Sequence, residues 1–156
     1  MKARVAASTA LVAALLLGST GCTFGATIAT QKDYDPSDGV GAEVGELAIR
    51  NALLIGETGE ELNLVMTVAS SADVNRRLIV QWQSGGERVS ESIVVAAGDR
   101  TRIGGPNDEI QIIVAGSGAT VGGLLPVFFS YTGAEGVQVP VPVLDGSLPE
   151  YELYIP

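Results

Sequence analysis

Short apolar segments alternate with turn-forming residues over most of the chain beyond residue 41. Each segment is rich in Val, Ile, Leu, Thr, Phe and Tyr, is bounded by Gly, Asp, Asn or Ser, and has no sustained helical period. The predicted strands are Glu43 to Ile55, Leu62 to Ala69, Leu78 to Gln83, Val89 to Ala96, Ile110 to Ala115, Leu124 to Thr132 and Val137 to Val143. About seven strands at this spacing predict an all-β sandwich.

Two of these segments carry a finer pattern. Apolar residues recur at every second position from Leu62 to Val68, which predicts that one face of that strand is buried. The segment from Val137 to Val143 alternates valines with Gln138, Pro140 and Pro142. Because proline has no amide hydrogen to donate, this second segment is predicted to be an edge strand.

The N-terminus has a different pattern, with a basic start, an apolar run and small residues. Lys2 and Arg4 precede an uncharged run from Val5 to Leu17, and Gly18 to Gly21 lead to Cys22. This order is typical of an export signal, whereas a membrane-spanning helix needs about 20 predominantly apolar residues. The predicted organisation is a signal over 1–21, a lipidated flexible tether over 22–41, a β-sandwich over 42–144 and a tail over 145–156.

The tether and the tail lack apolar periodicity. Asp33 to Gly39 alternates oxygen ligands as a calcium loop does, but an EF-hand loop starting at Asp33 needs Glu at its twelfth position, where Val44 stands. A solvated turn is therefore the preferred interpretation. For the tail, two alternatives stay open: Tyr151 and Tyr154 pack on the domain, or the segment trails free.

Composition and charge narrow the function. The chain has no His and one Cys, so it lacks the commonest general base and metal ligand and cannot form an internal disulfide. Removal of Lys2 and Arg4 with the signal leaves 7 basic against 18 acidic residues, a net charge of −11. Such a surface repels phosphate backbones, so nucleic acid is not an expected partner.

Candidate catalytic and binding motifs each have a simpler interpretation. Gly116 to Gly123 follows a strand, but no Lys closes it as a phosphate loop requires, so we interpret it as a mobile turn. The acidic pairs Glu60-Glu61 and Asp108-Glu109 are expected to be solvated. Arg100 and Arg102 share one face and suit a carboxylate or phosphate, although surface ion pairs with nearby acids are preferred. We predict no enzyme, no cofactor and no catalytic residues.

Cys22 lies in a sequence that resembles a known processing signal. Leu17-Gly18-Ser19-Thr20-Gly21-Cys22 resembles the lipobox of bacterial lipoproteins, in which the Cys receives a diacylglyceryl thioether and becomes the new N-terminus. Ser19 stands where that pattern usually has Leu. The resemblance implies lipidation at Cys22, with fatty acyl chains such as palmitate holding the protein on the outer face of a membrane.

The β-rich part resembles the PCu(A)C-type periplasmic copper chaperones, a cupredoxin-like β-sandwich family. The resemblance rests on three stretches: Leu64-Val65-Met66-Thr67-Val68-Ala69-Ser70-Ser71, Val95-Ala96-Ala97-Gly98-Asp99-Arg100-Thr101, and Leu125 to Tyr131 with Gly136 to Val141. Tyr34 to Val40, after the lipobox, resembles actinobacterial lipoproteins of this group. The resemblance implies an immunoglobulin-like or cupredoxin-like sandwich.

The copper ligands of that family are missing from the sequence. Its His-x-Met pair falls on Gln111 and Ile113, and Met66 is the one methionine left after signal removal. Met66 is expected to fill the core, so no metal site is predicted. We expect a membrane-anchored, non-catalytic binding module at the cell envelope, with an envelope protein or small ligand as partner. The alternative is a diverged copper chaperone.

Overall fold

The computed structural model describes residues 2–18 and 36–156 and divides the chain into two units, residues 1–34 and 35–156. In the first unit, α1 (Lys2–Gly18) covers most of the predicted signal. None of the helices in the described ranges is long and apolar enough to cross a membrane. Cys22 and most of the predicted tether lie outside the described residues.

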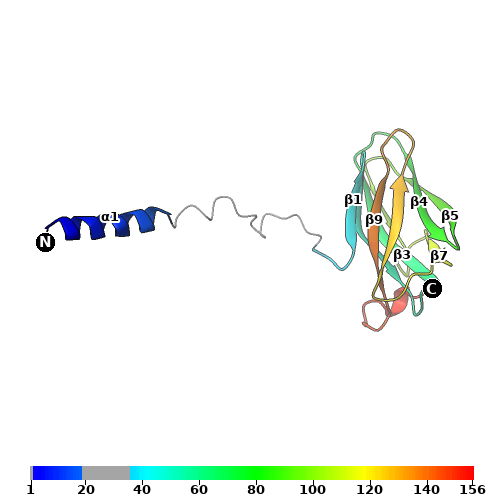
Figure 1. Cartoon of the computed structure of the whole chain (residues 1–156). Coiled ribbons are helices and arrows are strands. Elements are labelled where there is room, and N and C mark those ends of the chain that lie inside the picture. The colour runs from blue at the N-terminus through cyan, green and yellow to red at the C-terminus, as the bar shows by residue number, and fades with distance from the viewer. Residues whose placement is uncertain (1, 19–35) are drawn as a thin grey trace. The chain divides into compact units, whose positions relative to one another are not determined.

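The second unit is built from strands, which confirms the all-β prediction (Figure 1). Nine strands are described: β1 (Val40–Val44), β2 (Leu47–Ile55), β3 (Glu61–Ser70), β4 (Arg76–Ser84), β5 (Glu87–Val95), β6 (Arg100–Ile103), β7 (Ile113–Ala115), β8 (Leu124–Ser130) and β9 (Val137–Leu144). A short 3-10 helix, η2 (Glu152–Tyr154), follows β9.

The count of nine corrects the prediction of seven. The segment Glu43 to Ile55 is part of a hairpin, because the chain reverses at Gly45, whose φ of 54° lies in the left-handed region that glycine adopts without strain. The sequence pattern does not predict β6, because its two arginines on either side of Thr101 show no apolar periodicity. It is placed by pairing with β3, a contact that local sequence does not encode.

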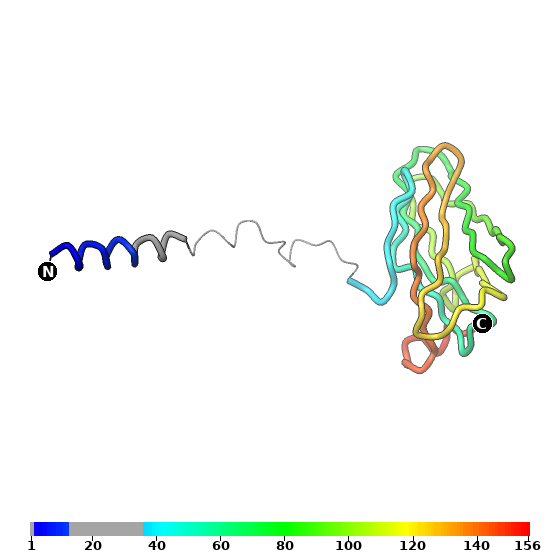
Figure 2. The backbone as a smooth tube through the Cα atoms, viewed as in Figure 1, coloured from blue at the N-terminus to red at the C-terminus, as the bar shows by residue number. Residues whose placement is uncertain are grey.

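The strands form one sheet that curls on itself, in the order β5-β4-β8-β9-β2-β3-β6, with β1 on β2 and β7 on β3 (Figure 2). We call β1, β2, β3, β6 and β7 the first sheet and β4, β5, β8 and β9 the second sheet. The two are joined where β9 runs parallel to β2, at Leu54 with Val143 and Ile55 with Leu144. The two layers enclose one apolar core.

The core confirms the period-two pattern of β3. Leu62, Leu64 and Val68 are fully buried and Met66 is 2% exposed, within a cluster that includes Phe129. Burial of each such side chain contributes about 1.5–3 kcal/mol relative to exposure, so these side chains hold the layers together. Met66 fills the core, as predicted.

β9 shows why its two prolines are tolerated. Val143 donates its backbone amide to Gly123 O on the β8 side. Because backbone amides point to alternate sides along a strand, the backbone nitrogens of Pro140 and Pro142 point away from β8, so no hydrogen bond to that strand is lost. On that side, pairing with β2 begins at Val143, just beyond the prolines. The edge-strand prediction is therefore correct for the proline-bearing part of β9 and wrong for its last two residues.

The C-terminal tail packs on the domain, which decides between the two alternatives. The Asn63 side chain donates from Nδ2 to Tyr154 O at 2.9 Å, and the Tyr151 hydroxyl donates to the carboxylate of Asp38. This bond, with Asp38 and Glu150 charges nearby and partial burial, raises the pKa of Tyr151 to about 12. The tail is thus held at two places: on β3 through Asn63, and on the segment before β1 through Asp38.

Candidate functional site

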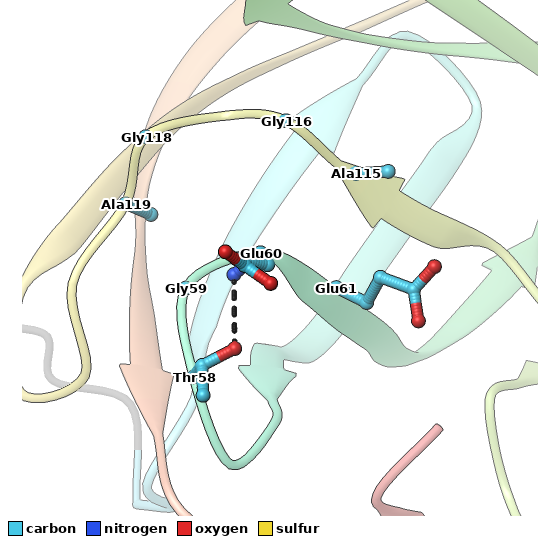
Figure 3. A pocket seen from close by; sticks show the side chains of 8 residues that line it. All are labelled: Thr58, Gly59, Glu60, Glu61, Ala115, Gly116, Gly118 and Ala119. Atoms are coloured by element: carbon cyan, nitrogen blue, oxygen red, sulfur yellow. Dashed lines mark hydrogen bonds between the residues drawn. The ribbon is translucent and has the colours of Figure 1, made fainter.

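One cavity lies at the end of the sandwich, between the β2–β3 turn and the loop after β7 (Figure 3). It measures about 740 Å³ and is lined by Thr58, Gly59, Glu60, Glu61, Ala115, Gly116, Gly118 and Ala119. The two loops touch, because a Cβ on Gly59 would stand 1.6 Å from Ala119 O. Gly116 also donates its amide to Glu60 O at 3.0 Å.

This cavity does not have the chemistry of a phosphate loop. The amides of Gly116, Gly122 and Gly123 already donate to carbonyl oxygens, and Ala119 N donates to the Ser117 hydroxyl. A phosphate site needs several free amides that point at the ligand. The glycine run is a turn between strands, as interpreted from the sequence.

The acidic pairs do not form acid–base partners. Figure 3 shows the Glu61 carboxylate directed away from that of Glu60. Asp108 accepts from Gly105 N at 2.9 Å, while neighbouring Glu109 is exposed. Across residues 2–18 and 36–156, no three His, Cys, Asp or Glu side chains gather closely enough to hold a metal ion.

The two positions where the resemblance led us to expect copper ligands, Gln111 and Ile113, hold side chains that take part in the fold. Gln111 donates from Nε2 to Gly105 O at 2.8 Å and to Asp108 O at 3.2 Å. Ile113 is 40% exposed and pairs with Asn63 across β7 and β3. With Met66 buried in the core, no thioether or imidazole reaches this end of the sandwich among the described residues.

The arginines of the first sheet are partly neutralised. Arg102 Nε lies 3.4 Å from Asp108 Oδ1, as the preferred ion-pair interpretation predicted, and Arg50 pairs with Glu43. The side chain of Arg100 has no such partner in the described part. Asp38, from the segment interpreted as a solvated turn, accepts a hydrogen bond from Tyr151, while Asp33 to Asp35 lie outside the described residues.

A second cavity, which no sequence motif indicates, lies on the outward face of the second sheet. It measures about 290 Å³ and is lined by Gln81, Trp82, Gln83, Arg88, Pro126, Phe128 and Gln138. The strand register brings these residues together, since Gln83 pairs with Arg88 and Phe128 pairs with both Gln81 and Gln138. The alternation of apolar and polar residues within each strand could have identified the outward positions. It could not have shown which strands are neighbours in the sheet.

Comparison with known proteins finds likeness in the fold. No protein-family model and no curated protein matches the sequence. Among solved structures, the chain is similar to an apo PmoF2 PCuAC domain, with 20% identity, a TM-score of 0.54, and coverage of 70% of this chain and 98% of that one. The domain has a PCuAC-like fold. An apo PCuAC domain from PmoF1 matches with 12% identity and a TM-score of 0.55, over 67% of this chain and 98% of that one.

A third match is a copper-bound PCuAC domain from PmoF2, with 21% identity and a TM-score of 0.52, over 68% of this chain and 98% of that one. At this identity the PCuAC likeness concerns the fold, since function resides in particular side chains. It confirms the sandwich that the three resembling stretches implied.

Proposed function

We propose that this protein is a lipid-anchored, extracytoplasmic binding module that keeps a PCuAC-like fold without the copper ligands. One observation carries the proposal: at the expected His-x-Met positions, Gln111 is bound to backbone carbonyls and Ile113 offers no donor. The cavity on the outward face of the second sheet, lined by polar side chains, supports a role in binding a partner. The lipobox-like sequence before Cys22 supports anchoring on the outer face of a membrane.

Copper titration tests the binding half of this proposal. The chain, purified in mild detergent, is titrated with Cu(I) against a competing chelator, and we expect it to retain no copper. The double variant Gln111→His with Ile113→Met restores two soft donors at exposed positions and should gain a site. One retained equivalent in the unaltered chain, reduced by Met66→Leu, would contradict the proposal.

Mass analysis and fractionation test the anchoring half. Cys22→Ser removes the thiol that would carry the lipid, so the protein should leave the membrane fraction or keep its signal. Ser19→Leu, which brings the sequence closer to the usual lipobox, should leave anchoring intact. An unmodified Cys22 in membrane-bound protein would rule out the lipid anchor.

A diverged copper chaperone is the second candidate. The copper-bound PmoF2 domain favours it, because that domain and this chain share a fold. If the unaltered chain retains Cu(I) against the chelator, the result favours this second candidate. Carboxylate binding of Cu(II) would not distinguish the two, since an acidic surface binds divalent ions weakly at many points.

A further inference from the structure

The outward face of the second sheet differs in charge from the rest of this acidic protein. Outward positions alternate along β4, β5, β8 and β9, and none of them is Asp or Glu. The residues are Arg77, Ile79, Gln81 and Gln83; Arg88, Ser90, Ser92 and Val94; Leu124, Pro126, Phe128 and Ser130; and Gln138, Pro140 and Pro142. An anionic ligand that the acidic side chains on other surfaces repel can therefore approach this face.

Several polar groups around the cavity on this face have no partner within the protein. In the part of the chain that the structure describes, the side chains of Gln83, Arg88 and Gln138 make no hydrogen bond or ion pair, whereas Gln81 donates to Ser90 Oγ at 2.6 Å. Trp82 also borders the cavity, but its side chain alternates inward with Leu78 and Val80, is 4% exposed and packs in the core, so its indole nitrogen does not face the ligand. The free side chains of Gln83, Arg88 and Gln138 around one cavity are available to a ligand.

The chemistry of these groups indicates the ligand. The guanidinium of Arg88 can bind a carboxylate with two hydrogen bonds, and the carboxamides of Gln83 and Gln138 can each donate to and accept from hydroxyls. Phe128, half-buried with its ring over Gly136, and Pro126 give an apolar floor. From β5 to β9 the face spans three strand spacings, about 14 Å, so the ligand is extended.

We propose that this surface, the Gln83–Arg88–Phe128–Gln138 face, binds an oligosaccharide that carries carboxylate groups. A protein partner fits less well, because a stable protein interface buries about 800 Å² on each side around several large apolar anchors, and this cavity offers one aromatic ring at its surface. The inference rests on the proposed binding function and names its ligand class.

Isothermal titration calorimetry supplies the readout, because the indole of Trp82 packs in the core on the other side of the sheet and is not a direct reporter. The full chain in a zwitterionic, sugar-free detergent is titrated with tetragalacturonate and, separately, with a neutral galactose tetrasaccharide. We expect the acidic probe to bind with the lower dissociation constant. Arg88→Gln should weaken binding of the acidic probe at least about tenfold, which is about 1.4 kcal/mol, because it removes the charge-assisted hydrogen bonds to the carboxylate.

Two controls make the result specific. Arg77→Gln, on the same face but outside the cavity and bonded to Ser92, should leave the affinity unchanged. Gln83→Ala should weaken both probes alike, because the carboxamide contacts hydroxyls. Equal affinity for the two probes, no binding of either, or an affinity that Arg88→Gln does not change would overturn the inference.

Self-association would also overturn it. If sedimentation shows a dimer that Arg88→Gln dissociates, the face is an interface between two copies of the chain. Failure of sugar binding is separable from failure of the anchoring proposal, since the Cys22→Ser protein should bind the acidic probe as the anchored form does.

Discussion

The end of the sandwich near Gln111 and the outward face of the second sheet treat their polar groups in opposite ways. At the end, the side-chain amide groups of Asn63 and Gln111 each donate two hydrogen bonds to backbone carbonyls and Asp108 accepts one from Gly105, although the buried Asn63 Oδ1 itself has no partner. On the face, Gln83 and Arg88 have no internal partner among the described residues. Polar groups that are satisfied internally stabilise the fold, while free ones around a cavity are available for binding.

The largest expected effect at the sandwich end concerns Gly104. Its φ is 81°, and a Cβ would lie 2.3 Å from Leu64 O, so Gly104→Ala forces backbone apart. We expect a loss of roughly 3 kcal/mol in the free energy of unfolding, measured by urea denaturation. Gly98→Ala, with φ of 64° and open space around it, should cost about 1 kcal/mol. Equal losses would show that Gly104 is not tightly packed.

Asn63 should rank next. Asn63→Ala removes the donor from Gly104 O and Tyr154 O, and a buried carbonyl left unpaired costs about 1–3 kcal/mol, so a loss of about 2–3 kcal/mol is expected. Hydrogen exchange should show the tail opening at the same time. Asn75→Ala, which removes an exposed acceptor of Ala97 N, is the matched control and should cost less than about 1 kcal/mol. A tail that stays protected in Asn63→Ala would contradict the role given to Asn63.

The two glutamines test the comparison directly. Gln111→Ala removes two hydrogen bonds from a partly exposed side chain and should cost about 1 kcal/mol of folding free energy. Gln83→Ala removes none and should change that free energy by less than about 0.5 kcal/mol. Thermal unfolding of both variants provides the measurement. A larger loss for Gln83→Ala would assign this side chain to the fold rather than to a ligand.

The smallest effect concerns the Tyr151–Asp38 contact and depends on pH. The hydrogen bond favours the neutral hydroxyl and raises the pKa of Tyr151 to about 12, so its contribution is complete below pH 10 and is lost between pH 10 and 12. Ultraviolet titration should show one tyrosine that ionises near pH 12, absent in Tyr151→Phe and kept in Tyr154→Phe. A titration of Tyr151→Phe that matches the unaltered chain would contradict the assignment.

Local pattern was sufficient for β3, but it merged the β1–β2 hairpin into one strand. Alternation from Leu62 to Val68 predicted the buried face of β3, because side chains of a strand point to opposite sides in turn. The prolines of β9 predicted that one edge of this strand is unpaired, because proline has no amide hydrogen to donate to a neighbouring strand. β6 escaped prediction since Arg100 and Arg102 carry no apolar signal, and its place depends on pairing with β3.

The amino-acid sequence by itself determined the all-β class, the lack of any His and the basic-then-apolar pattern of the N-terminus, because composition and period-two alternation are local properties. Tertiary structure alone decided that Asn63 holds Tyr154, 91 residues away, and that Phe128 and Gln138 join Gln83 and Arg88 around one cavity. Both depend on which strands become neighbours. That choice is made by packing two layers around a common core, and many pairings are compatible with the same local pattern.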